Sequence, residues 1–140
     1  MALNIDEILA LLDEWLKAED DTIAQTNKIS AGTGNETIKV FMDIIRTDSA
    51  KHKRIQQFMK DSLTKASPAL SFDEIATISD MVNEHLKLEQ ATVDMGQQLF
   101  EKMKLPILKD LADYLLADER LHVNLLNAMI NFKGHAEKNT

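Results

Sequence analysis

The chain has 140 residues, 44% of them hydrophobic, and a formal net charge of −7, which fits one domain with a hydrophobic core. The acidic balance, without a run of Lys or Arg, argues against a nucleic-acid or anionic membrane surface. The absence of cysteine excludes disulfides, thiolate ligands and iron–sulfur clusters. We find no secretory signal and no apolar stretch of about 18 residues, so we expect a cytoplasmic protein.

Four amphipathic helices are predicted, and the first two form a helical hairpin over about residues 4–65. Asn4 and Glu7 have capping spacing at the start of the first helix, and glycines end that helix near residue 32. The second helix is expected to begin near residue 35, with Thr33 and Glu36 as its capping box.

The second hairpin is expected over about residues 71–134, which makes residues 1–134 one four-helix-bundle domain. Ser71 and Glu74 form another capping box, and Pro106 occupies a favoured position in the first turn of the last helix. The last helix is expected to end near Gly134. The tail, 135–140, lacks apolar periodicity and is expected to be frayed.

The chain repeats itself at an offset of 70 residues, which predicts two copies of one hairpin. Identities run along both hairpins in one register, among them Ile5 and Ile75, Thr22 and Thr92, and Met59 and Met129. Three repeated pairs are chemically distinctive: Glu19 and Glu89, Asp48 and Asp118, His52 and His122.

Polar residues interrupt the apolar stripe of every helix near its middle. Spacing of three and four residues places six of them inward: Glu19, Asp48, His52, Glu89, Asp118 and His122. Burial of unpaired carboxylates costs several kcal/mol. A metal ion is the simplest common partner for carboxylates and imidazoles. The alternative is a hydrogen-bonded layer without metal that fixes the helix register.

Glu119 and His122 form a Glu-x-x-His pair on one helix face. With Glu19, Glu89 and His52, this pair resembles the ferritin-like superfamily, on its rubrerythrin and bacterioferritin side. The resemblance covers about residues 5–132 and implies a four-helix bundle that binds one or two metal ions. It implies iron, with manganese or zinc as alternatives. The same resemblance implies that all five residues are metal ligands.

Two acids outside this ligand set also match the superfamily. Asp48 and Asp118 each precede a histidine by four residues. By the resemblance, each would accept the free ring N–H of a ligand imidazole from the opposite hairpin and fix its tautomer.

The chain departs from the superfamily at Ser49, where a second Glu-x-x-His would have its glutamate. Asp48 could replace that ligand, water or substrate could fill the position, or only one metal ion would bind. The connection between the second and third helices is also short. It reaches roughly 27 Å, which leaves open a crossover with offset helices, an up-down-up-down bundle, or hairpin exchange between two chains.

The function that follows is metal binding with chemistry on dioxygen, peroxide or ferrous iron, in which case the protein is an oxidoreductase. The alternative is a non-enzymatic helical bundle for protein–protein interaction that keeps a relic polar layer. Expected partners are metal ions and a second copy of the chain, with no nucleic acid and no membrane. We expect His85 to be a partly buried structural histidine.

Overall fold

The computed structural model describes residues 4–65 and 71–138, with side chains as far as Asn131. Four helices make up this part of the chain: α1 (Ile5–Ala31), α2 (Glu36–Thr64), α3 (Phe72–Lys102) and α4 (Pro106–Lys138). No strand occurs among the residues described. The predicted all-α fold with four helices is confirmed.

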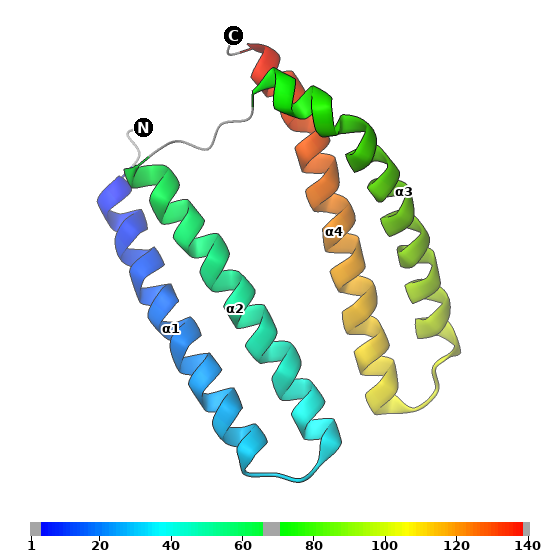
Figure 1. Ribbon diagram of the computed structural model, residues 1–140. Helices are drawn as coiled ribbons and strands as arrows, with labels where there is room; N and C mark the ends of the chain where they lie inside the picture. Colours follow the sequence, from blue (N-terminus) through cyan, green and yellow to red (C-terminus); the bar gives the residue numbers. More distant parts are fainter. Residues whose placement is uncertain (1–3, 66–70, 139–140) are drawn as a thin grey trace. The chain divides into compact units, whose positions relative to one another are not determined.

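The helices pack in pairs, as the repeat predicts. α1 packs against α2 and α3 packs against α4, and each pair runs antiparallel around a short turn (Figure 1). The chain divides into two compact units along this boundary. We name α1 and α2 the N-terminal hairpin, and α3 and α4 the C-terminal hairpin. The predictions about the connection between them fall on residues 66–70, outside the described residues.

Side-chain caps set most of the helix starts, as expected from the sequence. Asn4 accepts a hydrogen bond of 3.1 Å from the backbone N–H of Glu7. Ser71 and Glu74 form the predicted reciprocal box. These contacts satisfy N–H groups that have no partner within the helix.

Two predicted details of the helix ends are wrong. Asn35, not Thr33, caps α2, because its side chain accepts from the N–H of Ile38, while Thr33 accepts from the N–H of Asn35. α4 also does not end at Gly134 but continues to Lys138. A glycine inside a helix costs about 1 kcal/mol relative to alanine, which is too little to stop a helix of this length.

Burial within each hairpin is limited to the strip where its two helices meet. Leu12 is buried in the N-terminal hairpin, and Ile75, Ala112 and Leu116 are buried in the C-terminal one. Many side chains of the predicted apolar stripes are exposed, Leu115 and Leu125 among them. A helix pair covers only the facing side of each helix, so the rest of each apolar stripe stays uncovered within its own hairpin.

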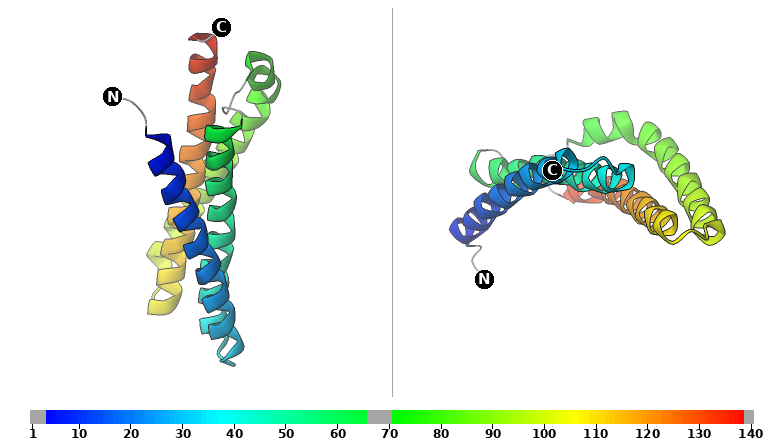
Figure 2. Two further views of the ribbon diagram at one scale, coloured as in Figure 1. Left: turned by 90° about the vertical axis from the view of Figure 1, so that its left-hand side faces the viewer. Right: turned by 90° about the horizontal axis from the view of Figure 1, so that it is seen from below.

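Gly96 of α3 faces Leu116 of α4 in the C-terminal hairpin. A Cβ atom at position 96 would lie 3.4 Å from Cδ1 of Leu116, an ordinary van der Waals distance. α3 also curves along its length (Figure 2). Thr77 and Ser79 donate hydroxyl hydrogen bonds to backbone carbonyls of the preceding turn, a contact that often bends helices. None of the described helices carries an apolar segment long enough to cross a bilayer.

Candidate metal centre

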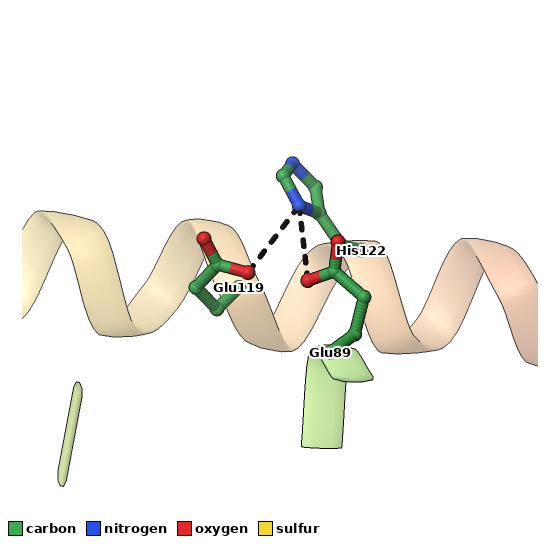
Figure 3. Close-up of side chains that lie close together, drawn as sticks. All are labelled: Glu89, Glu119 and His122. Atoms are coloured by element: carbon green, nitrogen blue, oxygen red, sulfur yellow. Dashed lines mark ion pairs between the residues drawn. The ribbon is translucent and has the colours of Figure 1, made fainter. Parts of the chain in front are cut away.

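Three of the predicted ligands meet in the C-terminal hairpin. Glu89 extends from α3 toward Glu119 and His122, which lie one turn apart on α4 (Figure 3). Nδ1 of His122 lies 3.4 Å from Oε2 of Glu89 and 3.6 Å from Oε2 of Glu119. One ligand atom from each residue lies within 4.8 Å of the other two. We call these three residues the Glu89 triad.

The geometry of the Glu89 triad suits a metal ion. Bonds from zinc to oxygen or imidazole nitrogen are about 2.0–2.2 Å long, so neighbouring ligands of one ion lie about 3–4 Å apart. Both distances from Nδ1 of His122 fall in that interval. Two carboxylates and one imidazole form a donor set used by iron, manganese and zinc.

Thr92, a residue without a predicted role, lies between the backbone of Glu89 and the carboxylate of Glu119. Its hydroxyl lies 2.9 Å from Oε2 of Glu119 and 2.7 Å from the backbone carbonyl of Glu89. A hydroxyl has one proton and donates one hydrogen bond at a time. Thr92 therefore donates either to the carboxylate of Glu119 on α4 or to the backbone carbonyl of Glu89 on α3. Its identity with Thr22 in the repeat was the available signal.

Asp48 and Asp118, the two acids predicted to accept from ligand histidines, each precede a histidine of the same helix by four residues. Oδ2 of Asp118 is 3.5 Å from Nε2 of His122, the nitrogen that faces away from the Glu89 triad. A carboxylate there favours the tautomer with Nδ1 free to bind a metal ion. Asp48 lies 3.3 Å from Lys51 in an ion pair. Their predicted contact with a histidine of the opposite hairpin remains a prediction.

His85 lies beside Glu89 on α3. Its side chain is 53% exposed, and its Nε2 lies 3.1 Å from Oε1 of Glu89, one turn away on the same helix. Its structural role remains a prediction. The spacing of four residues between His85 and Glu89 was a signal for this contact.

The partners of Glu89 favour its charged form. A hydrogen bond with the carboxyl of Glu119 is the largest influence that lowers the pKa of Glu89. His122 and His85 lower the pKa further, and partial burial opposes them. Glu89 therefore holds its negative charge to lower pH than a free glutamate, as an ionised metal ligand must.

The N-terminal hairpin holds only two of the predicted ligands together. Oε2 of Glu19 lies 3.1 Å from Nδ1 of His52. This ion pair lacks the alignment of a hydrogen bond, and Oε2 of Glu19 has no hydrogen-bond partner although it is buried. Ser49, 5% exposed, occupies the position that corresponds to Glu119. Among the described residues of this hairpin, no triad of possible metal ligands is found.

Each hairpin taken by itself brings part of the predicted ligand set together, three residues in the C-terminal hairpin and two in the N-terminal one. Among the described residues, the three of the C-terminal hairpin reach by themselves the donor number expected of a protein metal site. No family model, curated protein or solved structure matches this chain. The function is therefore argued from the chemistry of the Glu89 triad.

Proposed function

We propose that this cytoplasmic protein binds a transition-metal ion, iron in the first place, through Glu89, Glu119 and His122. The observation that carries the proposal is the convergence of two carboxylates and one imidazole nitrogen within 4.8 Å. Manganese and zinc are alternatives with the same donor preferences. Three protein ligands leave coordination positions for water or a small substrate, as in catalytic metal sites.

Each residue of the triad has a distinct task in this proposal. Glu89 and Glu119 offset the charge of the cation. His122 supplies Nδ1, while Asp118 lies at its other ring nitrogen and fixes the tautomer. A bound iron ion would supply reactivity toward dioxygen, peroxide or ferrous iron, as the resemblance to the ferritin-like superfamily implies. The protein residues hold the ion and set its charge.

A second candidate function is supported by Ser49. With a buried serine at this position, the N-terminal hairpin has Glu19 and His52 paired with each other, and its described residues add no third ligand to them. A bundle of this kind could serve protein–protein interaction and keep a polar layer without chemistry. Under that function the protein would fold fully without any metal ion.

Metal content per chain separates the two functions. The full chain is produced without an affinity tag, in medium supplemented with iron and manganese, and is analysed for metals without exposure to chelators. We expect one ion per chain from the triad, or two if Glu19 and His52 hold another. A folded protein without metal, which also takes up none on titration, would support the interaction function.

The ligands are tested by changing Glu119 and His122 to alanine together. Metal uptake should be lost while the far-ultraviolet circular dichroism of the helices is retained. Asp113→Ala is the matched control, since it removes one acid from an exposed position of the same helix. Retention of stoichiometric uptake by the double variant would refute the assignment of the site.

A further inference from the structure

The two oxygens of Glu89 face different partners. Oε2 faces His122 and the other members of the Glu89 triad, whereas Oε1 lies 3.1 Å from Nε2 of His85. The final torsion of a glutamate side chain is broad and roughly two-fold, so the carboxylate turns readily when nothing holds it. A contact that fixes Oε1 therefore also fixes the direction of Oε2.

His85 is not placed by burial, because its side chain is 53% exposed. It is four residues before Glu89 on α3, the spacing at which side chains on one helix face meet. The imidazole has one N–H in its neutral form, and a proton on Nε2 would be donated to Oε1 of Glu89. The ring position is thus explained by this one contact with a triad member.

The repeat shows that this contact belongs to one hairpin only. Trp15 occupies the position that corresponds to His85, so no histidine precedes Glu19 by one turn. Two differences therefore separate the hairpins at the site, Glu119 against Ser49 and His85 against Trp15. Both place additional polar groups around Glu89, in the hairpin that holds the triad.

We propose that His85 is a positioning residue that holds the carboxylate of Glu89 with Oε2 directed at the metal ion. This inference rests on the proposed function, since it assigns a role at the same site. His85 is not one of the three convergent ligands. It acts through Glu89, and substitution of such outer partners commonly reduces metal affinity 10–100-fold.

The test compares two variants of the full chain in titrations with Co²⁺, whose visible absorption reports both occupancy and ligand geometry. His85→Gln keeps an N–H donor that reaches the residue four positions on, and His85→Leu removes the donor. We expect a loss of about tenfold in Co²⁺ affinity for His85→Leu, and recovery of most of that loss in His85→Gln. The spectrum at saturation should be the same for both variants and the unmodified protein.

Glu84→Gln is the matched control, because it removes a charge beside His85 at another exposed position. It should bind Co²⁺ like the unmodified protein, and thermal unfolding without metal should show that all variants are folded. Unchanged affinity in His85→Leu would overturn the proposal. An equal loss in both His85 variants with an altered spectrum would also overturn it, since His85 would then be a ligand. If the unmodified protein binds no Co²⁺, iron or manganese, the proposed function itself fails.

Discussion

The two hairpins share one repeat but use the interface between their helices differently. The C-terminal hairpin buries Ile75, Ala112 and Leu116, whereas four polar residues are buried in the N-terminal hairpin. Those four are Glu19, Thr26, Ser49 and Gln56. The three residues of the Glu89 triad therefore lie in the hairpin whose buried residues are apolar.

The two hairpins also differ in the ion pairs between their helices. Lys53 pairs with Asp20 and Lys60 pairs with Asp13, so two lysines of α2 contact acids of α1. The corresponding positions on α4 are Val123 and Ile130. Exposed pairs contribute only about 0–1 kcal/mol each, but they favour one register of α1 against α2. Two hairpins built on one repeat can therefore bring different side chains together: two carboxylates and a histidine in one hairpin, and one carboxylate and a histidine in the other.

The largest loss of stability is expected from a substitution in the apolar interface of the C-terminal hairpin. Leu116 is 3% exposed, and Leu116→Ala should reduce the free energy of unfolding by about 3 kcal/mol, since it removes buried methyl groups and leaves a cavity. Chemical denaturation measures this change. Leu121→Ala, at a position 57% exposed on the same helix, is the control. Equal losses in the two variants would contradict the packing described for Leu116.

Ser49→Glu tests whether one residue separates the two hairpins as metal sites. The substitution gives the N-terminal hairpin the same three residue types as the Glu89 triad, so metal content should rise by about one ion per chain. Without metal, the buried carboxylate should lower the stability by several kcal/mol at most, and added metal should restore it. Ser49→Gln, similar in size and uncharged, should not raise metal content. A variant that binds no additional ion would show that the N-terminal hairpin differs in more than Ser49.

Substitution of Gln56 is expected to raise the stability of the N-terminal hairpin, by less than the losses predicted above. It is buried in the N-terminal hairpin, and its Oε1 has no hydrogen-bond partner. The repeat has Leu126 at this position. Gln56→Leu should therefore raise the free energy of unfolding by about 1 kcal/mol, because a buried unsatisfied acceptor is removed. The exposed neighbour Gln57, changed to Leu, serves as the control in the same denaturation experiment. Destabilisation by Gln56→Leu would indicate that the amide has a partner.

The smallest expected effect is the change in melting temperature caused by Glu89→Gln as the pH falls, in protein without metal. The folded protein lowers the pKa of Glu89 below its unfolded value, so the unfolded chain binds the proton more readily. The stabilising contribution of Glu89 is thus fully present above the ordinary glutamate range and is lost as the pH falls through the lowered pKa. We expect the melting temperatures of the unmodified protein and Glu89→Gln to converge on acidification in a chelator. A difference that grows as the pH falls would contradict the sign of the pKa change.

Local sequence signals predicted the helices well and the side-chain surroundings less well. Asn4, Ser71 and Pro106 located helix starts because capping depends on a few neighbouring residues. The 70-residue repeat predicted that both glutamates and both histidines meet in one layer; within the separate hairpins, Glu89 lies near His122 and Glu19 near His52. Periodicity assigns residues to a helix face, but it does not say how much of that face the neighbouring helix covers. Leu115 was expected inside a four-helix core, and its own hairpin alone leaves it exposed.

Residue spacing predicted which side chains meet in the C-terminal hairpin, but not the contacts around them. Glu119 and His122 carry a recognised spacing, whereas Thr92 contributes through a hydroxyl that most helical threonines direct at their own backbone. His85 is adjacent to the apolar stripe of α3, which suggested that its side chain packs in the core. Its contact with Glu89 depends on side-chain rotamers, which residue spacing alone does not determine.

The short turns between paired helices also bear on how the chain folds. Each hairpin joins its helices through three or four residues, at 32–35 and 103–105, so its interhelical contacts begin with residues close in sequence. Loops of this length close in well under a microsecond, and helical proteins rich in local contacts fold in microseconds to milliseconds. The first interhelical contacts of each hairpin are therefore expected to form next to its own turn, before contacts between residues farther apart in sequence.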